Sequence, residues 1–301
     1  MLQRKHVETV EKKLNVGMVK FVVVIELIRV KQWIKNGFVL APLLFTSSFV
    51  HIHSIKQSVI AFGLFCLASS AIYIINDLRD IEEDRRHPRK RKTRPLAADK
   101  ISKNNALLIL ACILMFLNLG WFFVPRLSEV IALFFILNLS YVFVFKYHPI
   151  WDIFVIACSF VMRIYGGTTA LNAPLSTWMF VTTLCLALFL AAIKRRQEVL
   201  QVGKSGRRVL TYYNEGLLNR YAETASIGTV VFYGLYVTIE QPELAVTIPL
   251  VIFGVFRYWF IAENLTTGDS PTDLLLEDPQ MLLIMILWVL ICGWVLWPTA
   301  F

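Results

Sequence analysis

Residues 59–84 read VIAFGLFCLASSAIYIINDLRDIEED, an apolar run that ends in a cluster of acidic side chains. A helix needs about 20 mainly apolar residues to cross the ~30 Å hydrocarbon core of a membrane. Hydrophobic residues make up 57% of the 301-residue chain and charged residues only 17%, whereas a soluble domain carries about 25% charge. The composition therefore predicts an all-α, polytopic membrane protein and excludes disordered, collagen-like and disulfide-stapled secreted proteins.

We expect a single integral membrane domain, residues 1–301, with nine transmembrane helices. The first apolar stretch is short, and we expect it to continue a helix that begins near residue 18 and passes through a polar kink. All five cysteines lie within apolar stretches and lack metal-type spacing, so we interpret them as small core residues. The predicted spans are 36–50, 56–78, 105–125, 127–146, 150–171, 175–193, 221–239, 243–262 and 279–299.

The distribution of positive charge orients the predicted bundle. Of the 30 lysines and arginines, 26 lie in residues 1–35, 79–104 and 194–220 or at Lys146. Nine spans place them all on one face, which the positive-inside rule makes cytoplasmic. Topology thus explains the net charge of +9, and a nucleic-acid partner is rejected. We expect an inner (plasma) membrane protein without a cleavable signal peptide, with a cytoplasmic lead-in at 1–17, cytoplasmic active-site loops at 79–104 and 194–220, and the C-terminus outside.

The acidic cluster after the second span predicts a metal site. If the helix continues, Asp77, Asp80 and Asp84 lie at positions i, i+3 and i+7 on one face, one residue after the amide of Asn76. Converging carboxylates repel one another unless a cation lies among them, and oxygen ligands suit Mg²⁺. Because protein side chains seldom supply all the ligands of Mg²⁺, the cluster also indicates a diphosphate as co-ligand. The alternative is a solvated acidic helix end.

A strongly basic segment follows the acids directly. Residues 85–94 hold seven lysines or arginines and one histidine. By themselves such cations would anchor anionic lipid headgroups. Next to an acidic cluster they instead indicate a phosphate ligand, whose oxygens the cations bind. The candidate residues in this segment are Arg86, Lys90, Arg91 and Arg94.

Three further polar segments point to the same face: residues 29–36, residues 138–152, and residues 194–198. The first can also be explained as a snorkelling girdle at the membrane interface. The last can be explained as a positive-inside stop signal, which leaves Glu198 unexplained. A charge inside a span, such as Arg163, requires a structural or ligand partner. The candidate substrate-binding residues are Gln32, Lys35, Asn36, Tyr141, Lys146, Asp152, Arg163, Lys194, Arg195 and Glu198.

The acidic motif has a familiar pattern. Asn76-Asp77-x-x-Asp80-x-x-x-Asp84, followed by His87-Pro88 and Arg94-Pro95-Leu96-Ala97, resembles the first aspartate-rich motif of the UbiA superfamily of membrane prenyltransferases. The resemblance covers most of the chain and implies a nine-helix UbiA-like bundle whose site opens to the cytoplasm. Aromatic prenyltransferases of that superfamily carry a second aspartate-rich motif after the sixth span. Here that place holds Lys194-Arg195-Arg196-Gln197-Glu198, so the resemblance to those enzymes is incomplete.

The pattern is similar instead to the decaprenyl-phosphate phosphoribosyltransferase branch. The shared features are Arg29-x-x-Gln32-Trp33-x-Lys35-Asn36, the Lys-Arg-x-x-Glu stretch at 194–198, Arg257-Tyr258, Pro271 and Asp278. The loop from Pro88 to Pro95 is one residue longer than that branch leads us to expect. Whether Lys90, Arg91 or Lys92 takes the basic position of the branch is therefore open.

This resemblance implies transfer of a phosphoribosyl group from 5-phosphoribosyl diphosphate (PRPP) to a polyprenyl phosphate in the lipid bilayer, with Mg²⁺, to supply pentose for the cell envelope. Asp77, Asp80 and Asp84 would serve metal, diphosphate or ribose hydroxyls, and Asn76 would orient them. Lys35, Lys146, Arg163, Lys194 and Arg195 would be candidates for binding the phosphate groups of PRPP and of the lipid.

Two other functions remain open at this stage. One is a prenyltransferase that moves a polyprenyl chain from its diphosphate to an aromatic or other acceptor. The other is a non-catalytic lipid-phosphate transporter, against which the clustered carboxylates argue, since binding an anion does not call for three acids. The acidic and Gly/Thr-rich signature of soluble PRPP enzymes is absent. Lipid chain length and homo-oligomerisation stay open.

Overall fold

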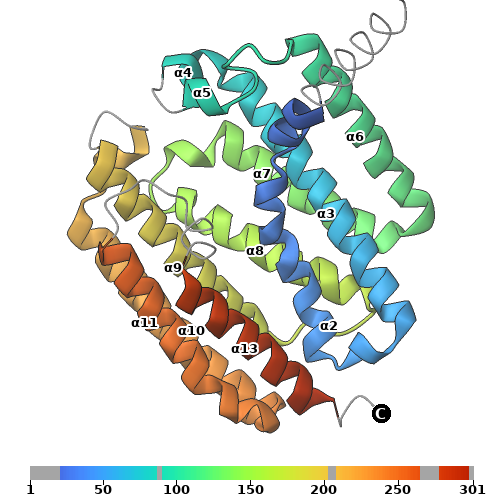
Figure 1. Ribbon diagram of the computed structural model, residues 1–301, viewed down its shortest axis with the longest axis vertical. Helices are drawn as coiled ribbons and strands as arrows, with labels where there is room; N and C mark the ends of the chain where they lie inside the picture. Colours follow the sequence, from blue (N-terminus) through green and yellow to red (C-terminus); the bar gives the residue numbers. More distant parts are fainter. Residues whose placement is uncertain (1–20, 87–89, 203–207, 265–277, 298–301) are drawn as a thin grey trace, which may run out of the picture. The chain divides into compact units, whose positions relative to one another are not determined.

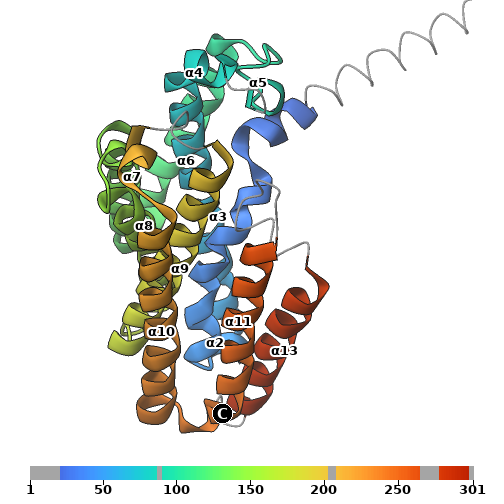
Figure 2. The same ribbon diagram turned by 90° about the vertical axis from the view of Figure 1, so that its left-hand side faces the viewer.

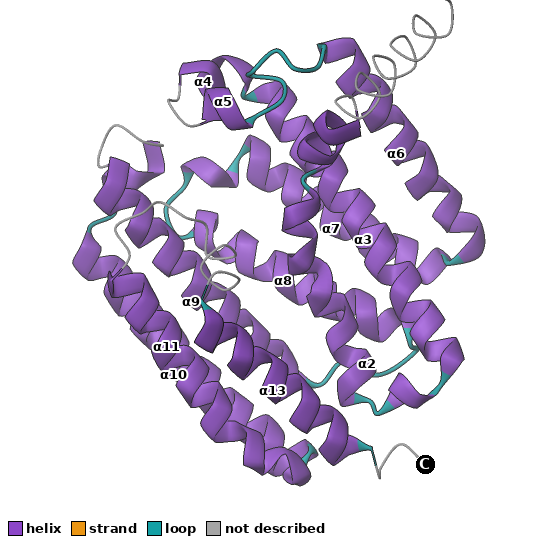
Figure 3. Ribbon diagram, in the orientation of Figure 1, coloured by secondary structure: helices purple, strands orange, loops and turns teal. Residues whose placement is uncertain are grey.

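A computed structural model (Figure 1; turned by 90° in Figure 2) describes residues 21–86, 90–202, 208–264 and 278–297. Throughout these ranges the regular structure is helical and there is no β-strand (Figure 3). The predicted all-α class is therefore confirmed. The predictions made for the lead-in at 1–17 and for His87, Pro88 and Pro271 lie outside the described residues.

Eight of the nine predicted spans correspond to helices long and apolar enough to cross a membrane. The five cysteines lie in these helices as free thiols. The helices are α3 (Ile52–Arg79), α6 (Lys103–Phe123), α7 (Pro125–Phe143), α8 (Trp151–Ala170), α9 (Thr177–Val202), α10 (Glu215–Glu240), η6 (Pro242–Thr247) continued by α11 (Ile248–Asn264), and α13 (Pro279–Leu296), where η denotes a 3-10 helix.

The first predicted span has a different backbone. Residues 21–28 are helical, and then η1 (Val30–Leu40), α2 (Ala41–Phe45) and η2 (Ser48–Val50) follow. The predicted polar interruption lies at Arg29, whose φ of 54° ends the helical turn before it. Ser70 contacts this kink: its hydroxyl accepts from the Trp33 indole at 3.0 Å and shares its proton between the Ile28 carbonyl, at 2.9 Å, and the Cys66 carbonyl of its own helix, at 2.8 Å. This stretch is therefore not a regular transmembrane α-helix.

The described chain forms two compact units, one within Met1–Ile34 and Cys66–Ser128, the other within Lys35–Phe65 and Glu129–Phe301. The single domain expected from the sequence stays a prediction. In the first unit, α4 (Ile81–Arg86) packs beside α5 (Lys90–Thr93) after the end of α3 (Figure 1). A turn with buried Leu96 follows, and the Ser102 hydroxyl then caps α6 by accepting from the Asn105 amide.

The second unit is a packed series of helices. Helix α9 packs against α8 and α10, and α11 packs against α10 and α13 (Figures 1 and 2). Glycine is required where α8 meets η1, because a Cβ at Gly167 would lie 2.2 Å from the Val39 carbonyl oxygen. The backbones can approach this closely only without a side chain.

Helix α13 begins at a charged clamp. The Asp278 carboxylate caps the helix by accepting from the Met281 amide at 2.8 Å. It also accepts two bonds from the Arg257 guanidinium, at 2.6 and 3.1 Å. Chiefly because of the hydrogen bond from Arg257, the pKa of Asp278 lies below its ordinary value of 3.8.

Candidate active site

The acidic cluster of the first unit lies where α3 gives way to α4. The helix is interrupted at Asp80, but helical hydrogen bonds continue on both sides of the break. The Asp80 amide donates to the Asn76 carbonyl at 3.0 Å, and the Asp84 amide donates to the Asp80 carbonyl at 2.8 Å. Asp77 and Asp84 are buried, and Asp80 and Asn76 are half-buried. A kinked helix thus keeps two of the three predicted carboxylates inside.

Three cations meet these two buried acids. Asp77 Oδ1 accepts from both Arg29 and Arg94. Lys90 Nζ lies 3.0 Å from Asp84 Oδ1, and Arg94 Nη1 lies 3.9 Å from Asp84 Oδ2. Buried carboxylates require such partners, because an unpaired charge away from water is costly. The structure therefore brings acidic and basic motifs together, as the sequence predicts.

Only some of the predicted basic residues reach the acids. Three residues were candidates for the basic position of the phosphoribosyltransferase branch. Of these, Lys90 contacts Asp84, whereas Arg91 and Lys92 are exposed. Arg86 is also exposed, and Gln32 is half-buried in the same unit.

Arg29 belongs to this site although it was not among the predicted site residues. Its guanidinium carbon lies 4.6 Å from the centre of the Tyr73 ring, which adds a cation–π contact to the ion pair with Asp77. Arg29 begins the polar segment 29–36, and this position in the sequence could have identified it as a site residue.

The site fits Mg²⁺ only in part. Within the described ranges, no three histidine, cysteine, aspartate or glutamate side chains are grouped closely enough to hold a metal by themselves. Asp77 Oδ2, however, is buried and has no hydrogen-bond partner. Mg²⁺ is commonly bound by one or two carboxylates together with substrate phosphates. The cluster therefore suits an ion that arrives with a phosphate ligand.

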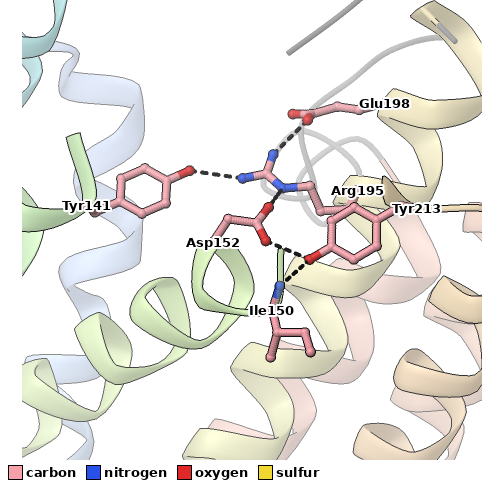
Figure 4. A network of polar contacts seen from close by, with 6 residues as sticks. All are labelled: Tyr141, Ile150, Asp152, Arg195, Glu198 and Tyr213. Atoms are coloured by element: carbon pink, nitrogen blue, oxygen red, sulfur yellow. Dashed lines mark hydrogen bonds and ion pairs between the residues drawn. The ribbon is translucent and has the colours of Figure 1, made fainter. Parts of the chain in front are cut away.

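A second polar network lies in the other unit (Figure 4). Arg195 Nε donates to Asp152 Oδ2 at 2.6 Å, Nη1 to Glu198 at 2.6 Å, and Nη2 to the Tyr141 hydroxyl at 2.9 Å. Asp152 is in the first turn of α8, while Arg195 and Glu198 are in α9. Four predicted residues are thus joined by direct contacts.

Tyr213, which sequence reasoning missed, completes this network. Its hydroxyl donates to Asp152 Oδ1 at 2.6 Å (Figure 4). Burial raises the pKa of Tyr213, and the hydrogen bond to Asp152 raises it further, so the hydroxyl keeps its proton. No motif contains Tyr213, and 61 residues separate it from Asp152.

Arg163 is held by other groups. Its Nε donates to Asn36 at 2.7 Å, its Nη1 donates to the Ser159 carbonyl at 2.7 Å, and its guanidinium lies against the rings of Phe134 and Phe160. These contacts give the charged side chain of Arg163 the structural partners that a charge inside a membrane span requires. Of the remaining predicted lysines, Lys146 is buried, and Lys35 and Lys194 are half-buried.

A model of the UbiA prenyltransferase family matches residues 38–276. The chain belongs to the UbiA prenyltransferase family. Among relatives of this UbiA-family protein, decaprenyl-phosphate phosphoribosyltransferase of Mycolicibacterium smegmatis is 31% identical over 88% of this chain and 89% of the relative. The enzyme of that name from Corynebacterium glutamicum is 31% identical over 92% of this chain and 86% of the relative. The resemblance stated from the sequence is thereby confirmed.

Solved structures agree with this fold. A UbiA homolog from Archaeoglobus fulgidus, bound to GPP and Mg²⁺, superposes with a TM-score of 0.70. The match covers 91% of this chain and 99% of that chain, at 19% sequence identity. At this identity the likeness shows the fold alone. The multi-pass membrane character is supported by the eight helices long and apolar enough to cross a membrane and by the family match.

Proposed function

We propose that this UbiA-family protein transfers the 5-phosphoribosyl group of PRPP to a polyprenyl phosphate and releases diphosphate. The observation that carries the proposal is the 31% identity, over nearly nine-tenths of the chain, to a protein named decaprenyl-phosphate phosphoribosyltransferase. The product is a lipid-linked phosphoribose that supplies pentose for the cell envelope. By the positive-inside rule, the site faces the cytoplasm from the inner membrane.

The chemistry requires charge stabilisation more than acid–base catalysis. An oxygen of the lipid phosphate attacks the anomeric carbon of PRPP while the bond from that carbon to the diphosphate oxygen breaks. The electron pair leaves with the diphosphate, and no proton must be removed because the nucleophile is already an anion. Positioning and preorganised charge therefore account for catalysis.

The acidic and basic residues of the first unit suit a diphosphate group. Asp77 and Asp84 would hold Mg²⁺, with Asp80 nearby and Asn76 preceding them. Mg²⁺, when bound, would neutralise charge on the departing diphosphate. Arg29, Lys90 and Arg94 already lie against the acids, within reach of phosphate oxygens.

The network in the second unit supports a donor other than a prenyl diphosphate. Where aromatic prenyltransferases of the superfamily have aspartates, this chain has Arg195 in a buried ion pair with Asp152. A guanidinium there cannot ligate a second metal ion, but it can orient groups that bind a phosphorylated sugar.

Turnover assays on protein reconstituted in nanodiscs test the proposal. With Mg²⁺, PRPP and polyprenyl phosphate together should yield diphosphate and a lipid heavier by one phosphoribosyl group. Release of diphosphate only from a polyprenyl diphosphate with an acceptor would replace the proposal with prenyl transfer. Binding of lipid phosphate without any product would indicate a carrier.

A matched pair of variants localises the activity. Asp77→Asn and Glu83→Gln each remove one carboxylate charge, the first buried and the second exposed on α4. Asp77→Asn should lower kcat/KM on the order of 100-fold, because a metal ligand contributes several kcal/mol to the transition state. Glu83→Gln should stay within about twofold, since surface substitutions seldom change function. Equal effects would refute the assignment.

A further inference from the structure

Tyr213 takes part in the network of Figure 4 although the proposed chemistry gives it no role. It lies between η5 (Arg208–Tyr212) and α10, and its side chain is 7% exposed. Its hydroxyl donates to Asp152 Oδ1 and accepts from the Ile150 amide, each at 2.6 Å. A hydroxyl has a single proton to donate, so this proton is committed to the carboxylate.

The bond to Ile150 fixes an unusual backbone. Ile150 has φ 72° and ψ −52° at the N-cap of α8. Positive φ is a genuine outlier for a β-branched residue. Such conformations persist only where the surroundings hold them, and they gather at functional sites. Tyr213 thus holds both the turn that leads into Asp152 and one oxygen of its carboxylate.

Asp152, held by Tyr213, in turn fixes Arg195 through a buried ion pair. Their side chains are 0% and 1% exposed and meet through Oδ2 and Nε. Each guanidinium nitrogen of Arg195 has a partner in the network. Because Arg195 is so deeply buried, it is poorly placed to meet a substrate. Two members of the network lie nearer the surface than Arg195, namely the half-buried Tyr141 and Glu198, whose side chain is 25% exposed.

We propose that Tyr213 is a positioning residue that acts through Asp152 and Arg195. It holds the Glu198 carboxylate and the Tyr141 hydroxyl in place for a phosphorylated sugar. Carboxylates accept hydrogen bonds from ribose hydroxyls, as acidic residues do in dinucleotide-binding folds, and a phenolic hydroxyl donates to phosphate oxygens. A polyprenyl phosphate offers no sugar hydroxyls, so the ligand is the sugar donor. This inference rests on the proposed function.

Tyr213→Phe removes only the hydroxyl, and Tyr212→Phe is the matched control, since Tyr212 is the preceding residue and is 67% exposed. Tyr213→Phe should raise KM for PRPP about 10-fold, the equivalent of ~1.4 kcal/mol or one hydrogen bond. Its kcat and its KM for polyprenyl phosphate should change by less than about threefold, well under one hydrogen bond. Tyr212→Phe should behave as wild type. A raised KM for the lipid alone would overturn the assignment to the sugar donor.

A double-mutant cycle separates positioning from stability. If Tyr213 acts through Glu198, adding Tyr213→Phe to Glu198→Gln should raise KM for PRPP little further, because contacts in one network are not additive. A merely structural role would lower the melting temperature and kcat while leaving KM for PRPP unchanged. That result, or additive effects on KM, would overturn the inference.

Binding measurements distinguish failure of this inference from failure of the proposed function. If the wild type does not turn over PRPP, the proposed function fails, and calorimetry with ribose 5-phosphate and inorganic phosphate still tests the network. The wild type should prefer ribose 5-phosphate, and Tyr213→Phe should reduce this preference about 10-fold. Absence of the preference, or its persistence in Tyr213→Phe, would overturn the inference.

Discussion

Arg94→Gln should make the protein bind Mg²⁺ alone more tightly and bind diphosphate more weakly. The buried acids Asp77 and Asp84 contact Arg29, Lys90 and Arg94. Three positive charges against two negative ones leave these side chains with one net positive charge, which repels a free cation and attracts an anion. Removing Arg94 neutralises them and relieves the competition for Asp77.

The structure sets the size of the effect. Two unit charges ~4 Å apart interact by about 1 kcal/mol in water and about 4 kcal/mol at an effective dielectric constant of 20. A divalent ion doubles these values. Arg94 is 20% exposed, and an ion bound by the acids would lie beyond them, so the lower limit applies. The expected gain is ~2 kcal/mol, or about 30-fold in the affinity for Mg²⁺.

Calorimetric titration of Mg²⁺ at low salt, with and without inorganic diphosphate, measures both effects. Lys103→Gln is the control, because it removes one positive charge from an exposed position at the start of α6. It should change either affinity by less than about threefold, as expected of a solvent-screened charge. Unchanged or weaker binding of Mg²⁺ to Arg94→Gln would refute the reasoning. Opposite changes for the two ligands cannot arise from misfolding.

Other expectations follow from packing, capping and metal dependence. Gly167→Ala should lower the melting temperature through overpacking of ~1–3 kcal/mol against Val39, whereas Gly63→Ala, with nothing within 4 Å, should raise it or leave it unchanged. Asp278→Asn keeps a good helix cap but loses the ion pair with Arg257. Asp278→Ala loses the cap as well, so it should be less stable than Asp278→Asn by ~1 kcal/mol. Because the pKa of Asp278 is lowered by folding, the stability it contributes is present above its ordinary pKa of 3.8 and is lost in more acid solution, which thermal unfolding in acid buffers checks. Chelation should abolish release of diphosphate without lowering the melting temperature, because cations already pair with the buried acids.

Hydropathy located most of the fold because a membrane imposes a length on every span. Eight helices lie where apolar runs predict them. The stretch from Arg29 to Leu40 was not predictable as a 3-10 helix, since it depends on the tertiary bonds of Ser70 with Ile28 and Trp33. Such bonds join positions about 40 residues apart and leave no local pattern.

The site was predictable where its residues are close in sequence. Asp77 and Asp84 share a helical face, and Lys90 and Arg94 follow within one loop, so spacing was enough to group them. Spacing could not show that Asp80 stays half-buried at a bend. Nor could it join Asp152 with Arg195 and Tyr213, which come from separate elements and pair only after helices pack.

The Arg195 network also limits how this sequence can diverge. Its ionic pair is buried, and breaking such a pair by removing one partner typically costs about 3–5 kcal/mol, a large part of the stability of a typical domain. A lineage that exchanged Arg195 for an acid would need simultaneous changes at Asp152 and Tyr213 to remain folded. Exchange of the proposed sugar donor for a prenyl donor is therefore expected to cross a fitness valley rather than proceed by single tolerated steps.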